Sequence, residues 1–323
     1  MSKKKIDKAR QKRLAKQNAA RARKASGAGN PSMPMLRPVN GDASDDIPFP
    51  MPDPRAMEAQ LRGMFGVQEN TPAAQAQELM SEAFDKMSGP ERVALAHQAL
   101  EVSPDCADAW VLLAEEEATT AEEAIELLRK GVSAGERLIG PEAFEENAGE
   151  FWGVLETRPY MRARANLAQY LWATGEEGGT REAVGHYREL VRLDSRDHQG
   201  HREILLVLLV EIGEDEEAAQ LIESHPGVGT ACWLYSNALL AFRRGGDCDG
   251  AREALADALD QNPHVPGFLL GETTMPDEPP MNMGYGDENE AVHYVAGAMA
   301  GWDETQEALS WLEAQAALPT VDA

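Results

Sequence analysis

The stretch GEFWGVLETRPYMRARA, residues 149–165, gathers side chains that could bind or react with a ligand. Three of them, Arg158, Arg162 and Arg164, lie close together in a chain that carries 55 acidic and 30 basic residues. A guanidinium presents a planar fork of donors that matches a carboxylate. One interpretation is therefore a groove that clamps an acidic or C-terminal peptide.

The other interpretation is structural. The arginines would pair inside the fold with Glu150, Glu156 or Glu203, and Trp152 would fill the space between two blocks of helices. Thr157 would cap a helix that has a proline in its first turn, which is a common helix start. If the stretch instead binds a partner, the residues expected to do so are Trp152, Glu156, Arg158, Tyr160, Arg162 and Arg202.

The segment DHQGH, residues 197–201, is the best candidate for a metal site. Asp197, His198 and His201 are ligand types, and two histidines three residues apart can share a helix face. However, a third strong ligand is missing nearby, and Gly200 is typical of a turn into a helix. We therefore predict an exposed polar turn, the start of a helix and no metal site.

The sequence contains no catalytic motif of the nucleotide-binding or serine-nucleophile kinds. The cysteines Cys106, Cys232 and Cys248 share no CxxC spacing, which suits a reducing compartment. The segment GGDCDG, residues 245–250, lacks the closing glutamate of a calcium loop and is interpreted as a turn between helices. We predict a cytoplasmic protein that is not an enzyme and uses no cofactor.

Charge is distributed unevenly along the chain. The formal net charge is −25, but residues 1–24 carry eleven Lys and Arg and a single acid, so the tail is strongly basic and the body strongly acidic. Only the tail is suited to bind phosphates, in a salt-sensitive and sequence-independent way. It could equally be a solubilising extension. The tail residues expected to contact nucleic acid or a ribosome are Lys3, Lys4, Lys5, Arg10, Lys12 and Arg13.

Residues 1–54 predict a disordered basic tail followed by a Pro/Gly-rich linker, because no periodic apolar face occurs there. The basic start does not run into an apolar stretch, so no secretory signal is expected. The most lipid-like run, ILLVLLV at 204–210, is far shorter than the roughly 20 residues that a bilayer requires. It is interpreted as a buried helix face, and no membrane partner is expected.

From Arg55 onward, Ala, Leu and Glu dominate and no segment alternates as a strand does, which predicts an all-α body. Residues 232–265 follow the tetratricopeptide (TPR) pattern, with a small alanine where two helices approach closely. The equivalent alanines Ala183, Ala218 and Ala251 recur at nearly the ~34-residue TPR period. We therefore predict a TPR-like α-solenoid of helix-turn-helix repeats, with five helical pairs.

The period is interrupted between Ala124 and Ala183, and residues 149–165 lie in the extra segment. After the last repeat, the predicted helical cap covers the apolar end of the solenoid. The predicted organisation is a tail and linker at 1–54, a TPR-like domain at 55–267, an irregular Pro/Met-rich connection at 268–286 and the cap at 287–317.

Several segments resemble bacterial TPR proteins related to the suppressor-of-tumorigenicity (ST-seven-like) family. They are FWG…ETRPYMRA at 151–163, SRDHQGHRE at 195–203, NPHVP at 262–266 and YGDENEAVHY…W…ALSWL at 285–312. The resemblance covers residues 75–312 and implies a TPR-like α-solenoid without an established catalytic activity. The family pattern tends to have Asn and Ile where this chain has His198 and His201, which also disfavours a metal site.

The predicted function is a scaffold that binds an unidentified protein or peptide in the groove of the solenoid. The first alternative is an adaptor that the basic tail anchors to nucleic acid or ribosomes. The second alternative is an uncharacterised enzyme. Repeat packing alone does not dictate the identity of residues 149–165, so we expect this stretch to distinguish the chain from a generic scaffold, either as a docking site or as a structural wedge.

Overall fold

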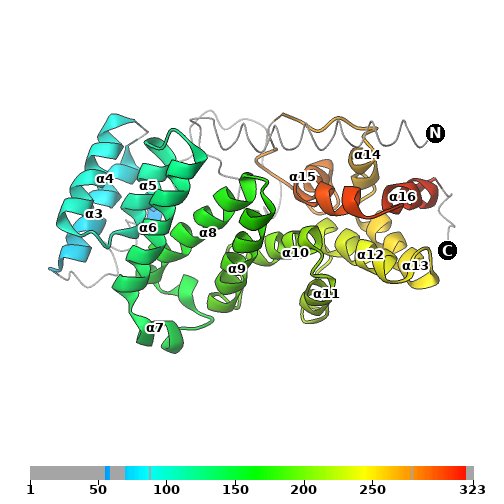
Figure 1. The fold of residues 1–323 in the computed structure, drawn as a ribbon, viewed down its shortest axis with the longest axis horizontal. Coiled ribbons are helices and arrows are strands. Elements are labelled where there is room, and N and C mark those ends of the chain that lie inside the picture. The colour runs from blue at the N-terminus through cyan, green and yellow to red at the C-terminus, as the bar shows by residue number, and fades with distance from the viewer. Residues whose placement is uncertain (1–54, 59–69, 87–88, 278, 318–323) are drawn as a thin grey trace. The chain divides into compact units, whose positions relative to one another are not determined.

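The structure, a computed structural model, describes residues 55–58, 70–86, 89–277 and 279–317. Within these ranges the chain forms helices, turns and connections without a strand, so the predicted all-α fold class is confirmed (Figure 1). The tail residues predicted to contact nucleic acid lie outside the described residues. The chain divides between His198 and Gln199 into two compact units, inside the predicted 55–267 repeat domain. We call them the N-terminal and the C-terminal unit.

The N-terminal unit is built from consecutive helix pairs, and the helices of each pair pack on one another. Two short 3₁₀ turns and a small helix separate the second pair from the third, and residues 55–58 form a helical turn ahead of all of them. The elements are α3 (Pro72–Asp85), α4 (Pro90–Val102), α5 (Ala107–Glu116), α6 (Ala121–Ile139), α7 (Pro141–Glu146), η1 (Phe151–Gly153), η2 (Leu155–Thr157), α8 (Arg158–Ala173) and α9 (Glu177–Leu193).

The C-terminal unit begins with two further pairs and ends with three helices that pack on one another, the middle one of which also packs on the pairs. Its elements are α10 (His201–Ile212), α11 (Asp215–Glu223), α12 (Ala231–Gly245), α13 (Asp249–Gln261), α14 (Val265–Leu269), α15 (Glu288–Glu304) and α16 (Ala308–Ala316). The predicted turn at GGDCDG is confirmed, because it joins α12 to α13.

Several helices begin at residues whose side chains satisfy the free backbone N–H groups of the first turn. The hydroxyls of Thr71, Thr120 and Thr230 and the carboxylate of Asp287 each accept a hydrogen bond from the backbone N–H three residues later. Such caps stabilise a helix by about 1 kcal/mol each. The starts of α3, α6, α12 and α15 are therefore fixed by local sequence.

Small residues allow the helices of each pair to approach closely. Ala124, Ala183, Ala218 and Ala251, the alanines that reveal the period, are each at most 1% exposed. They lie in α6, α9, α11 and α13, the second helix of four successive pairs. With α3 and α4, the five predicted helical pairs are all present.

One close approach depends on a glycine. A Cβ atom at Gly135 in α6 would lie 2.7 Å from the Cβ of Tyr160 in α8. Real Cβ atoms do not come this near to one another, so α6 and α8 could not keep their separation with a larger residue there. The site described below depends on this contact, because α8 carries its arginines.

The predicted terminal cap consists of α15 and α16, after an irregular connection. Helix α15 packs along α10, α12 and α14, so it contacts the first helices of two pairs and not the last pair alone. The Arg243 guanidinium holds these elements together, because it donates hydrogen bonds to the Val210 and Gly301 carbonyls and to the Asp215 carboxylate at 2.6–3.0 Å. The cap is thus integrated into the C-terminal unit.

The apolar run at 204–210 forms most of α10, and Leu205–Val210 are all buried. This confirms the prediction that the run is a buried part of a helix. In the part of the chain that the structure describes, we find no helix with the length and hydrophobicity needed to cross a bilayer.

Candidate interaction site around residues 149–165

The segment that precedes α8 is fixed to the end of α9. The Gly149 carbonyl accepts hydrogen bonds from the backbone N–H of Ser195 at 2.9 Å and from its hydroxyl at 3.0 Å. The backbones of Glu150 and Asp194 form an isolated bridge beside them. The extra segment is thus an ordered connection that returns the chain to the start of α8.

Thr157 stands at the N-cap position of α8, as predicted, but its side chain does not cap the helix. Its buried hydroxyl instead donates to the carbonyls of Phe151 and Val154 in the preceding 3₁₀ turns. The prediction of a Thr157 side-chain cap is therefore wrong. The Thr157 hydroxyl thus holds the turns η1 and η2 together. A threonine hydroxyl can be used in this way in place of capping the helix that follows.

Trp152 and Arg158 form one contact. The Arg158 guanidinium lies over the Trp152 ring, 4.9 Å from its centroid, and its Nε donates to the Trp152 carbonyl at 2.8 Å. An arginine side chain typically stacks its planar guanidinium on an aromatic ring and donates hydrogen bonds from the edge of that guanidinium. Trp152 remains partly exposed, and Glu156 is exposed.

Tyr160 is a buried residue of α8 and is only 1% exposed. Its ring packs against Phe144 and Phe151, and its hydroxyl accepts a hydrogen bond from Arg164. Burial raises the pKa of Tyr160 to about 12. Tyr160 therefore anchors α7 and η1 to α8 and is not available to a partner in this structure.

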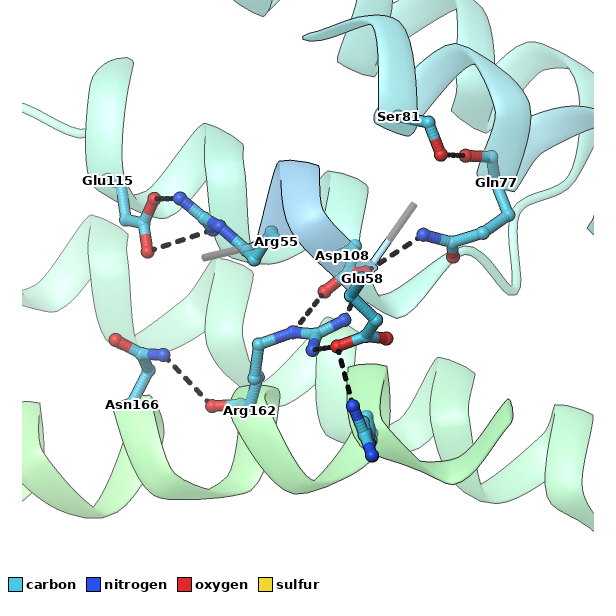
Figure 2. Close-up of polar contacts among 9 residues, drawn as sticks. Arg55, Glu58, Gln77, Ser81, Asp108, Glu115, Arg162 and Asn166 are labelled. Carbon is cyan, nitrogen blue, oxygen red and sulfur yellow. Dashed lines mark hydrogen bonds and ion pairs between the residues drawn. The ribbon is translucent and has the colours of Figure 1, made fainter. Parts of the chain in front are cut away.

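Arg162 is the centre of a buried ion cluster with Asp108 and Glu58 (Figure 2). Its Nε and Nη2 donate to the two carboxylate oxygens of Asp108 at 2.9 and 2.7 Å, and its Nη1 donates to Glu58 at 2.8 Å. Gln77 donates to Asp108 from α3 at 3.0 Å, and Arg158 lies 3.6 Å from the same Glu58 oxygen. The cluster thus joins α3, α5, α8 and the turn at 55–58.

The charges in this cluster stabilise one another. Burial by itself would raise the pKa of the Asp108 carboxyl, but the adjacent Arg162 guanidinium outweighs that effect and holds the pKa below its ordinary value. Burial likewise disfavours the charged form of Arg162, and Asp108 and Glu58 together outweigh it, so the pKa of Arg162 is raised. Both groups are therefore charged, as a bidentate pair requires.

The sequence-based choice of acidic partners for the arginines is corrected by these contacts. We expected Glu150, Glu156 or Glu203, whereas Arg158 and Arg162 bind Glu58 and Asp108, and Arg164 lies 3.5 Å from Glu136. The signal for Asp108 in the sequence was its place in the first turn of a helix, ADAWVLLAEE, directly before a run of apolar residues. No feature of the local sequence distinguishes Glu58 from the other acidic residues, because its partner Arg162 is 104 positions away along the chain.

A second ion pair lies on the other side of the turn at 55–58. Arg55 donates to both carboxylate oxygens of Glu115, at 3.3 and 2.9 Å, and its guanidinium lies over the Phe84 ring at 4.4 Å. Ala56 between the two ion pairs is buried in the apolar cluster that contains Met80 and Phe84. Sequence reasoning did not identify this contact.

The remaining predicted residue, Arg202, does not join this cluster. It lies in the first turn of α10, in the C-terminal unit. His198 pairs with Asp194, Nδ1 to Oδ1, at 2.7 Å, while His201 is buried at the start of α10. Among the described residues, we find no group of three or more histidines, cysteines and carboxylates that could hold a metal ion.

Comparison with known proteins shows that the chain is similar to one family. The family model described as ST7 protein matches residues 55–195, which lie within the N-terminal unit and include the turn at 55–58. A rat "Suppressor of tumorigenicity 7 protein-like" is 28% identical over 259 residues, covering 73% of this chain and 45% of the relative. The human protein of the same name shows 28% identity over 259 residues, with 73% and 44% coverage.

A "Protein ST7 homolog" from Caenorhabditis elegans is 27% identical over 271 residues, covering 73% of this chain and 49% of the relative. The chain thus spans slightly less than half the length of these curated relatives. The predicted resemblance is confirmed at the level of similarity to the ST7 family. Its narrower parts stay predictions. These relatives are animal proteins, which leaves the bacterial assignment unconfirmed, and the TPR assignment is not named by the family model or by the relatives.

Proposed function

We propose that this chain, whose residues 55–195 match the ST7 family, is a non-catalytic helical scaffold that binds a protein partner on its N-terminal unit. The observation that carries the proposal is the turn at 55–58. It lies outside the helix pairs, yet side chains from α3, α5 and α8 hold it by an ion pair at each end and an apolar contact between them. Helix pairs that hold one short helical segment in this way are suited to hold another.

The chemistry of the pairs supports binding over reaction. A general acid or base must reach a substrate, and its pKa must suit proton transfer. Asp108 and Arg162 are instead buried and bonded to each other in a fixed geometry, with pKa values shifted toward the charged forms. Such a pair orients and recognises charged groups.

A cross-linking experiment tests the proposal. A photoreactive phenylalanine analogue is placed at Trp152, which is partly exposed beside Arg158, and at Arg181, which is exposed on α9, as the matched control. We expect a protein to be cross-linked from position 152 of the full chain in cells and not from position 181. Mass spectrometry identifies the cross-linked chain.

Two outcomes would contradict the scaffold. One is cross-linking at equal yield from both positions, which indicates non-specific encounter. The other is the absence of any cross-linked protein from position 152 at a cross-linker efficiency proven on a known complex. A cross-link to RNA would favour the adaptor alternative, in which the basic tail supplies the contact.

A further inference from the structure

The turn at 55–58 presents three of its four side chains to the helix pairs of the N-terminal unit. Ala56 is 6% exposed and Glu58 is 8% exposed, whereas Met57 is 62% exposed. The Arg55 side chain is 13% exposed in its pair with Glu115. On a helix, positions i and i+3 lie on one face, so Arg55 and Glu58 point to the same side and Met57 points away.

The surface that receives the turn has a fixed order of charges. Glu115 of α5 stands at one end, and Arg158 and Arg162 of α8 stand at the other. Between them lies the apolar cluster with Met80 and Phe84 of α3, which accepts a side chain as small as that of Ala56. This order complements a helical turn with a cation first, a small residue next and an acid at the fourth position.

All of the receiving residues belong to the helix pairs, whereas the turn precedes the first pair. The paired guanidinium and carboxylate groups are largely removed from water, which strengthens their attraction and makes an unpaired member costly. An empty site would leave the Arg158 and Arg162 donors without Glu58. The surface is therefore more stable when a helical turn with these charges occupies it than when it is empty.

We propose that the surface formed by α3, α5 and α8 is a docking site for a partner helix with the pattern Arg–small–x–Glu, and that residues 55–58 occupy it in cis until such a helix displaces them. This inference rests on the proposed scaffold function and adds the class of ligand and its regulation. The cis segment acts as a competitor for the partner. A tethered ligand competes at an effective concentration on the order of mM.

The test uses a fluorescent peptide with the sequence PDPRAMEAQLR, residues 52–62 of this chain, titrated into the full chain. The receptors are the wild type and the variant Arg55→Gln/Glu58→Gln, whose cis segment has lost both charges. We expect the peptide to bind the variant at least about tenfold more tightly than the wild type, because the cis competitor is weakened. Fluorescence anisotropy gives both affinities.

Matched peptides test the pattern. A peptide with Glu58→Gln should lose binding, whereas a peptide with Met57→Ala should bind as the original does, because Met57 points away from the site. The receptor Glu115→Arg should reject the original peptide and accept the peptide with Arg55→Glu. This exchange of specificity keeps the test decisive if the double variant is unstable.

The proposal is overturned if the peptide binds the wild type and the folded double variant equally, or if it binds neither at mM concentration. A dimer that forms through Glu58 would also overturn it, because the occupant would then be a second copy of this chain. Cross-linking of a partner from position 152 without peptide binding would leave the scaffold in place and reject only this recognition pattern. Peptide binding without a cellular partner would reject the scaffold alone.

Discussion

At the scale of single residues, the charged side chain of Arg162 is largely buried. It has a bidentate partner in Asp108, which is fully buried, and a second acid in Glu58. Solvent does not screen such a pair, and the loss of one member leaves the other charged and unpaired. Arg162 is thus a structural centre of the N-terminal unit, and Arg158 beside it is the more accessible cation.

We therefore predict that Arg162→Met lowers the free energy of unfolding by about 3–5 kcal/mol, because Asp108 is left buried without its partner. The control is Arg192→Met, which removes a half-exposed arginine paired with Glu189 and should cost about 0–1 kcal/mol. Urea unfolding followed by tryptophan fluorescence measures both. Equal decreases in the free energy of unfolding for the two variants would show that the buried cluster stabilises the fold no more than an exposed ion pair does.

A second residue-scale prediction concerns His186 in α9. Burial lowers its pKa to about 4, and the charge of Arg164 acts in the same direction, although Glu182 partly opposes both. In the unfolded chain a histidine titrates near pH 6.5. Between these values the unfolded state takes up a proton that the folded state does not bind, so stability falls as the pH decreases from about 6.5 toward 4.

We expect His186→Gln to reduce this loss by about 2 kcal/mol at pH 4 relative to pH 7, because glutamine does not titrate. The measurement is the difference in unfolding free energy between variant and wild type at several pH values, in which the contributions of the carboxylates cancel. The difference should be constant between pH 7.5 and 8.5. A difference that does not change from pH 8 to pH 4 would refute the assignment.

At the scale of elements, the site depends on how closely α8 lies to its neighbours. Gly135 lets α6 approach the backbone of α8 at Tyr160. Tyr160 in turn packs on Phe144 and Phe151, which positions the turns before α8. The arginines are thus placed by a helix contact that a single methyl group would disturb.

Two glycine substitutions separate this contact from helix propensity. Gly135→Ala should destabilise the N-terminal unit by about 1–3 kcal/mol, because the added methyl group overpacks the contact with Tyr160. Gly185→Ala in α9 has no atom within 4 Å of the added Cβ and should stabilise the helix by up to about 1 kcal/mol. Thermal unfolding by circular dichroism gives both signs. Stabilisation by Gly135→Ala would show that α6 and α8 can move apart without cost.

At the scale of the whole molecule, charge separates the body from the first 24 residues. The tail holds eleven of the 30 basic residues, while the rest of the chain is strongly acidic. An acidic surface repels nucleic acid, so the tail and the body are suited to different kinds of partner. The proposed protein partner should therefore not depend on the tail.

Deletion of residues 1–24 tests this separation. We expect the deletion to leave cross-linking from position 152 unchanged and to weaken any salt-sensitive binding of single-stranded RNA. A plot of the logarithm of the binding constant against the logarithm of the salt concentration should have a slope that is shallower by about 0.7 for each phosphate contact that is lost. Loss of the protein cross-link on deletion would instead identify the tail as the anchor of the partner.

The sequence by itself determined the helices and their pairing, because these depend on local features. Apolar periodicity, capping residues and the small Ala183, Ala218 and Ala251 lie within one or two turns of the contacts that they create. The same local evidence identified residues 149–165 as an interruption of the period. It did not show how Thr157 would be used, because its hydroxyl can either cap α8 or bond the preceding turns.

Only the tertiary structure decided which acids the arginines bind. Asp108 is 54 positions from Arg162 along the chain, and Glu58 is 104 positions away. In a chain with 55 acidic residues, composition cannot select these two. The choice follows from the packing of α3, α5 and α8, which buries Asp108 opposite Arg162 and leaves room for one helical turn between Glu115 and Arg158.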